Sequence, residues 1–223
     1  MAINRSVDRS PVSVAEAHLA RVAAVGSSRH RYLTALLEAS TLNPARDLAD
    51  AVHLLCGLHG NQPSLVELAQ RHSSDGPGRE WLARAAEAFE RERLFLVRLT
   101  SAVGPLPSTP GAAETEATMN AQRNALEILS TSERKGCALG AAAALIGDWW
   151  PIRRLLDRAA SRAGLDSPAP ALPDEASIVA VIEAASDTPS SERALGFGGE
   201  QLLLQHRGLF DLLEARAEAR SDY

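Results

Sequence analysis

The sequence predicts an all-α fold, an antiparallel helical bundle with additional short N-terminal helices. Along most of the 223-residue chain, apolar residues recur at spacings of three, four and seven, which is the pattern of amphipathic helices. The alternation of apolar and polar residues that is typical of strands is nearly absent. Short segments rich in proline and glycine separate the helical stretches, and short connections favour antiparallel neighbours.

The N-terminal part is predicted to contain four short helices, and residues 1–12 before them are expected to be flexible. Gly26-Ser27-Ser28 separates the first two helices, Asn43-Pro44 supplies a cap and a first-turn proline for the third, and Gln62-Pro63 opens the fourth. The predicted ranges are approximately 13–24, 29–39, 44–58 and 62–71.

Longer helices are predicted in the remainder, over approximately 79–103, 110–129, 132–163, 174–185 and 189–219. Thr109-Pro110 and Ser132 are the expected starts of the second and third of these. Pro151 predicts a kink in the third helix or its division into two. Residues 165–173 form a proline-rich linker, and an interruption at Gly196–Gly199 is an alternative to one continuous last helix. Residues 1–223 are predicted to form a single all-α domain.

Composition excludes several classes of protein. The net charge of −5 and the pI near 5.7 argue against a partner recognised through its phosphates, so no nucleic acid is expected. The most apolar run, Gly136–Ile152, is short for a membrane span and contains Asp148, so a buried helix and no membrane partner are expected. Its small residues Gly136, Gly140 and Ala144 predict a close helix contact. The N-terminus lacks the apolar stretch of a signal peptide, which favours a cytoplasmic location.

Seven side chains on or beside the apolar stripes are candidate ligand-binding residues: His59, Glu92, Gln122, Glu127, Asp148, Trp149 and His206. His206 and Asp148 have apolar residues on both sides along their helices. Burying an unpaired polar group costs about 1–3 kcal/mol, so we expect these groups to pair with one another or with a ligand. Several helices that each supply one inward polar group would form an interior site. The alternative is that each of them only satisfies backbone groups or neighbouring side chains.

A metal centre is not predicted. Carboxylate-bridged di-iron bundles require Glu-x-x-His on two helices, and the nearest match is a single Asp50-Ala-Val-His53. The two cysteines, Cys56 and Cys137, are predicted to be reduced thiols in the core. No cofactor is assigned from the sequence.

Three stretches carry a resemblance to a known family: Gly104–Gly111 leading into Glu114-Thr-Glu116, Glu133–Leu145 leading into Asp148-Trp149, and Gln201–Leu209 leading into Glu214-Ala-Arg216. Together they resemble an uncharacterised all-helical protein family of sphingomonad-type bacteria. The resemblance implies a bacterial origin and a helical fold, and it implies no activity. The architecture is also faintly similar to ferritin-like and haem-oxygenase-like bundles, whose ligand motifs are incomplete here.

Three hypotheses for function remain open. The first, favoured by the lack of a catalytic signature, is a helical module that binds a small-molecule ligand or a protein partner at an interior polar site. The second is a metal-binding or ferritin-like or haem-oxygenase-like bundle enzyme that uses inward His and carboxylate residues. The third is a homo-oligomer that buries a helix face against a second copy.

Overall fold

The computed structural model describes residues 13–74 and 76–221, and over these ranges the chain is helical and contains no strand. The all-α prediction is therefore confirmed. The elements are α1 (Val14–Val25), the short 3-10 helix η1 (Ser27–Arg29), α2 (Arg31–Glu38), α3 (Pro44–His59), α4 (Leu65–His72), α5 (Pro77–Ala102), α6 (Ala112–Ser130), α7 (Cys137–Ala163), α8 (Glu175–Ala185) and α9 (Pro189–Ser221). The predicted flexibility of residues 1–12 lies outside the described residues.

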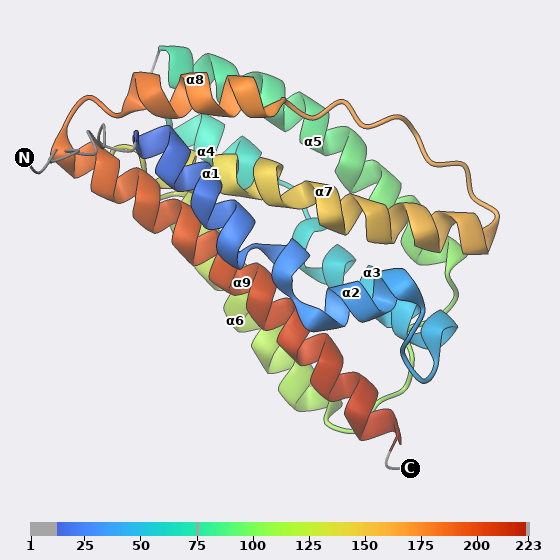
Figure 1. Ribbon diagram of the computed structural model, residues 1–223. Coiled ribbons are helices and arrows are strands. Elements are labelled where there is room, and N and C mark those ends of the chain that lie inside the picture. The colour runs from blue at the N-terminus through green and yellow to red at the C-terminus, as the bar shows by residue number, and fades with distance from the viewer. Residues whose placement is uncertain (1–12, 75, 222–223) are drawn as a thin grey trace, which may run out of the picture.

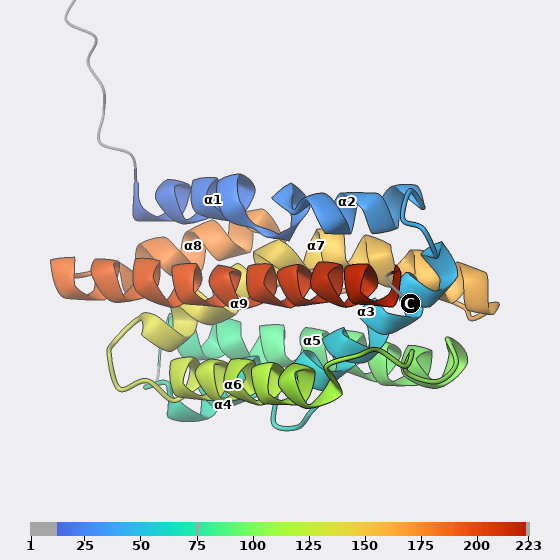
Figure 2. The ribbon, with the colours of Figure 1, turned by 90° about the horizontal axis from the view of Figure 1, so that it is seen from below.

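The helices are arranged in layers around α7 and α9, which pack closely in their N-terminal parts and diverge toward their C-terminal ends (Figure 1). Seen from below, α1 and α2 lie on one side of this pair, and α4, α5 and α6 lie on the other (Figure 2). One cluster of buried apolar residues includes members of every α-helix in the described ranges. None of the described helices has a stretch both long and apolar enough to cross a membrane.

Local signals explain most helix starts. The hydroxyls of Ser13 and Ser64 each accept a hydrogen bond from the backbone N–H three residues later. Their own backbone N–H groups donate to the glutamate at that position, which forms capping boxes at α1 and α4. Asp174 caps α8. Pro44 and Pro189 begin α3 and α9, as their sequence contexts predict.

Three predicted starts are wrong. Pro63 follows a cis peptide bond and precedes the Ser64 cap, so α4 begins later than predicted. Pro110 lies before α6, whose N-cap is Gly111. Ser132 does not cap α7, because residues 132–136 turn before the helix begins. Gly136 makes that turn with a φ of +96°, packed against the backbone of Ser191 and the side chain of Leu195.

The two longest apolar helices are continuous. α7 passes through Pro151 without dividing, so the prediction of two separate helices is wrong. α9 continues through Gly196–Gly199, so no interruption occurs there. The glycines instead permit a close crossing, because Gly198 faces the backbone of Cys137 in α7 and Gly140 faces the backbone of Leu195 in α9. The small-residue face predicted in α7 is confirmed by this contact.

Segment 165–173 connects α7 to α8 without regular secondary structure. It is nevertheless attached to the core, since Leu172 is buried and the Pro168 carbonyl accepts a hydrogen bond from Arg153. Cys56 is partly buried, Cys137 is buried, and both are free thiols.

Candidate functional site

A chain of buried hydrogen bonds joins η1, α7, α9 and α3 through the centre of the molecule. Asp148 accepts from Ser27 twice, with its Oδ1 2.7 Å from the backbone nitrogen and its Oδ2 2.5 Å from the hydroxyl. The same Oδ2 lies 2.7 Å from His206 Nδ1. His206 Nε2 lies 3.1 Å from His59 Nε2. Four side chains from four separate elements thus form one line, and each is at least 94% buried.

The partners fix where the protons lie. A carboxylate only accepts, so Nδ1 of His206 carries the hydrogen that it donates to Asp148. In the neutral ring, Nε2 of His206 is then a lone pair, which accepts from Nε2–H of His59. His59 Nδ1 is left as a lone pair and has no hydrogen-bond partner among the described residues. The His59 end of the chain is therefore a hydrogen-bond acceptor.

Apolar rings surround His59 and keep it neutral. Its ring packs edge-on against Phe89 and Trp149, at centroid distances of 6.2 and 5.4 Å. Burial lowers the pKa of His59 well below its ordinary value, and the neighbouring His206 lowers it further. At neutral pH, His59 is therefore uncharged and able to accept a proton or a hydrogen bond.

His59 forms part of the wall of a pocket of about 230 Å³ between α3, α4, α5 and α6. We call it the α3–α6 pocket. Its walls combine apolar and polar side chains. The apolar lining residues are Leu58, Pro63, Leu65, Leu68, Phe89 and Leu126, and the polar ones are His59, Asn61, Gln62, Ser64, Arg123, Glu127 and Ser130. In small-molecule sites, apolar surface holds the body of the ligand and polar groups fix its orientation.

Glu92 and Trp149 form a second buried group beside the first. Trp149 Nε1 donates to Glu92 Oε2 at 3.0 Å, and Arg153 Nη1 donates to Glu92 Oε1 at 2.6 Å. Arg153 also bonds Asp157 at 2.9 Å, a pairing that the four-residue spacing predicts. Glu92 is therefore neutralised by a salt bridge, and it is linked to the His59 chain through the Trp149 ring, which packs against His59.

Gln122 and Glu127, both on α6, differ in placement. Gln122 is buried, donates to the Gln205 carbonyl at 3.1 Å, and leaves its own carbonyl oxygen unpartnered among the described residues. Glu127 is exposed and lines the pocket, so its role as a ligand-binding residue stays a prediction. The four-residue spacing places it one turn beyond Arg123, on the outer edge of the same helix face.

Sequence reasoning missed Ser27, Arg216 and Arg220. Ser27 lies in a segment interpreted only as a helix break, yet both of its donors hold Asp148. A β-carbon at the preceding Gly26 would overlap that carboxylate, so glycine is required for the approach. Burial of Arg216 could have been predicted, because it continues the apolar stripe of Leu202 and Leu209 at a spacing of seven residues.

These arginines form a buried cluster with two acids of α3. Arg216 binds Asp50 through two nitrogens, at 3.0 and 2.8 Å. Arg220 bonds Asp50 at 2.6 Å and Asp47 at 2.8 Å. Two positive and two negative charges balance, so the cluster joins the end of α9 to α3 without a net charge that would attract a ligand.

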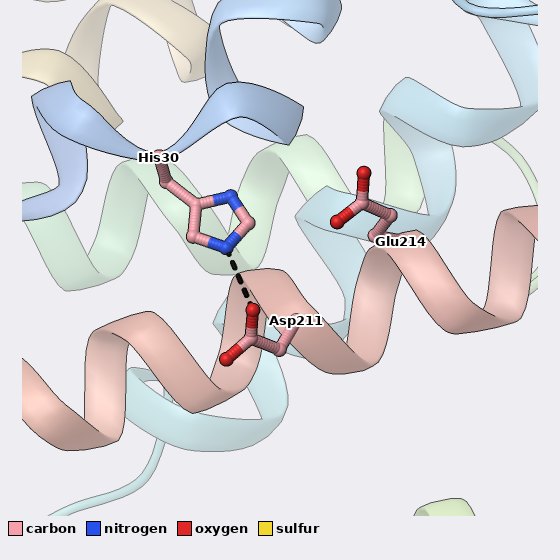
Figure 3. A group of neighbouring side chains, drawn as sticks. All are labelled: His30, Asp211 and Glu214. Atoms are coloured by element: carbon pink, nitrogen blue, oxygen red, sulfur yellow. Dashed lines mark hydrogen bonds and ion pairs between the residues drawn. The ribbon is translucent and has the colours of Figure 1, made fainter.

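His30, Asp211 and Glu214 lie close enough for one atom of each to fall within 4.8 Å of the others (Figure 3). Their hydrogen bonds do not suit a metal ion. The Tyr32 backbone N–H donates to His30 Nδ1 at 3.2 Å, so the ring hydrogen lies on Nε2, which donates to Asp211 at 3.0 Å. Coordination requires a free lone pair on that same Nε2. Glu214 is also bound by Arg31, and we assign no metal here.

The comparisons with known proteins identify a family and no activity. No curated protein and no solved structure matches the chain. A family model described as "Family of unknown function (DUF6975)" matches residues 22–221, which contain the whole buried hydrogen-bond chain and the α3–α6 pocket. The prediction of an uncharacterised helical family is confirmed, and the protein belongs to this family of unknown function.

Proposed function

We propose that this protein binds a small molecule in the α3–α6 pocket, with His59 Nδ1 accepting a hydrogen bond from the ligand. A volume of about 230 Å³ lies below the range of pockets that take drug-sized molecules, which favours a single ring or a short chain as the ligand. Leu58, Leu65, Phe89 and Leu126 favour an apolar body for that ligand.

One observation carries the proposal: the buried chain from Ser27 through Asp148 and His206 ends at His59, a residue that lines the pocket and whose Nδ1 has no hydrogen-bond partner among the described residues. Leaving a buried polar atom unpaired costs about 1–3 kcal/mol, so a ligand that donates a hydrogen bond to His59 Nδ1 would gain affinity from that contact. The supporting hydrogen bonds also fix the His59 ring, which favours binding by reducing the cost of ordering it.

The test compares phenol with anisole, its methyl ether, in ¹H–¹⁵N spectra of the wild-type protein. The two rings have similar apolar surfaces, and only phenol can donate to His59. We expect phenol to shift the resonances of pocket residues such as Ser64 and Ser130, with about tenfold tighter binding than anisole, which is the upper range for one hydrogen bond. Equal affinities, or shifts confined to other surfaces, would contradict the proposal.

Two histidine variants in α3 provide the matched control. His59→Asn removes the pocket acceptor, whereas His53→Asn removes a histidine that bonds only the Gly104 carbonyl at 2.8 Å. Phenol should lose its advantage over anisole in His59→Asn and keep it in His53→Asn. Loss of the advantage in both variants would indicate a general effect on α3 instead of a site at His59.

A further inference from the structure

We infer that the natural ligand of the α3–α6 pocket is a weak acid, and that its proton is taken up by His59 and stored on His206 beside Asp148. This inference rests on the proposed function and names the ligand class and the chemistry of the same site. The juxtaposition that carries it is a lone pair at the pocket, a second imidazole 3.1 Å behind it, and a carboxylate 2.7 Å behind that.

The transfer involves two proton steps and conserves every hydrogen. The ligand X–H bond breaks and an N–H bond forms at His59 Nδ1. The N–H bond at His59 Nε2 breaks and an N–H bond forms at His206 Nε2. The ligand becomes an anion, His59 remains neutral with its hydrogen now on Nδ1, and His206 becomes an imidazolium ion. No electrons are exchanged and no co-reactant is needed.

The charges that result are both compensated. The imidazolium of His206 donates to the Asp148 carboxylate, which accepts two further hydrogen bonds from Ser27. The ligand anion lies in a pocket that also contains the Arg123 guanidinium, whose Nη1 is anchored 3.2 Å from the Gly57 carbonyl. The neutral His59 between them then donates to the anion from Nδ1, so the ligand exchanges one good hydrogen bond for another.

The geometry permits only one extra proton. The two Nε2 atoms face each other at 3.1 Å, and a single hydrogen occupies the space between them, so the pair cannot carry two positive charges without separating. A weak acid that supplies one proton therefore matches the capacity of the pair.

Other ionisable groups near the chain are accounted for among the described residues. Glu92 of α5 is neutralised by Arg153 of α7, and Arg93 of α5 pairs with Glu90 at the pocket edge. Glu127 of α6 lies exposed at the rim opposite the inner wall. His18 of α1 lies near Gly199 of α9, and burial lowers its pKa to about 4, so it stays neutral. The buried chain itself contains three ionisable groups, Asp148, His59 and His206. The charged groups that face it across the pocket are then Arg123 and Glu127.

The first test needs only the proton as ligand. Protein labelled with ¹⁵N-histidine is titrated with acid, and long-range ¹H–¹⁵N spectra report which ring nitrogen carries hydrogen. As the pH falls, His206 should become the imidazolium while His59 changes from the Nε2–H to the Nδ1–H form. If His59 becomes the imidazolium while His206 remains neutral, the inference is overturned.

Asp148→Asn and His53→Asn extend this titration. Without the carboxylate, uptake of the first proton should require at least a tenfold higher proton concentration. His53→Asn should titrate as the wild-type protein does. An unchanged titration in folded Asp148→Asn would also overturn the inference, and the wild-type spectra remain decisive if that variant does not fold.

The second test uses 4-nitrophenol, whose neutral and anionic forms absorb at different wavelengths. At a pH where the free probe is mostly protonated, the wild-type protein should convert the bound probe to the anion, while His206 acquires the imidazolium shifts. A probe that binds in its neutral form overturns the inference and leaves the proposed function intact. A probe that leaves both its own spectrum and the histidine resonances unchanged at millimolar concentration overturns the ligand class, and the phenol–anisole comparison separately decides the proposed function.

Discussion

Two glycines in α9, two residues apart, should respond to alanine in opposite directions. A β-carbon at Gly198 would lie 2.9 Å from the carbonyl carbon of Cys137 and 3.1 Å from the nitrogen of Ala141, and it would overlap the Cys137 oxygen between them. These are backbone atoms of α7 and cannot rotate away. A β-carbon at Gly196 meets no other atom within 4 Å.

The expected magnitudes follow from that difference. Alanine gains about 0.5–1 kcal/mol over glycine within a helix, so Gly196→Ala should stabilise the protein by this amount. At Gly198 the same gain is opposed by overpacking, which costs up to about 3 kcal/mol. The added methyl group pushes α9 away from α7, and a gap of about 0.5–1 Å removes a quarter to a half of the dispersion attraction between atoms in contact. Gly198→Ala should therefore lose about 2 kcal/mol.

Urea unfolding followed by circular dichroism measures both free energies. For a chain of this size, about 1 kcal/mol corresponds to roughly 2–4 °C, so thermal midpoints should move by about +1 to +4 °C for Gly196→Ala and −4 to −8 °C for Gly198→Ala. If the two variants changed the stability in the same direction, or by equal amounts, the close crossing of α7 and α9 would be refuted.

Two further predictions concern buried charge and pH. Arg153→Met should cost about 3–5 kcal/mol, because it leaves the buried Glu92 carboxylate without its cation, and adding Glu92→Leu should recover most of that loss in the same urea assay. The neutral form of His18 is favoured on folding, because burial first and Arg21 second lower its pKa from 6.5 to about 4. The unfolded chain thus binds the additional proton, and the stability present above pH 6.5 is lost as the pH falls toward 4, by about 3 kcal/mol for this group. Unfolding measured between pH 7 and 4 should show a shallower loss in His18→Asn, and an identical slope in both proteins would contradict the assignment.

Helix content was predictable from the sequence because it depends on local periodicity. The capping residues Ser13 and Asp174 and the first-turn prolines Pro44 and Pro189 are local signals, and they mark the starts that were predicted well. Pro63 and Pro110 failed as markers because a proline precedes a helix as readily as it begins one. Nothing local distinguishes those cases.

The residues of the candidate site also divide into those with a local sequence signal and those without one. His59, Asp148 and His206 were found because each interrupts an apolar stripe, and the expectation that they pair with one another was correct. Ser27 could not be found, because a serine beside a glycine is a turn signal until the fold brings it against α7. Whether Glu127 faces inward depends on a rotation of α6 that its own sequence leaves undetermined, since its neighbours Ala125 and Ile128 are respectively small and exposed.

The seven-residue spacing along α9 constrains the length of this helix in members of the family, as well as the residues that it contains. Gly199, His206, Leu213 and Arg220 succeed one another on one side of the helix, so the close crossing, the buried hydrogen-bond chain and the salt-bridge cluster share a single register. One residue inserted between Gly199 and His206 would turn everything after it by about 100° and advance it by about 1.5 Å. Insertion of a whole heptad would nearly restore the rotation, yet it would carry His206 about 10 Å past Asp148. Substitutions can therefore accumulate on the outer face of α9, whereas insertions and deletions within it should be absent from functional relatives.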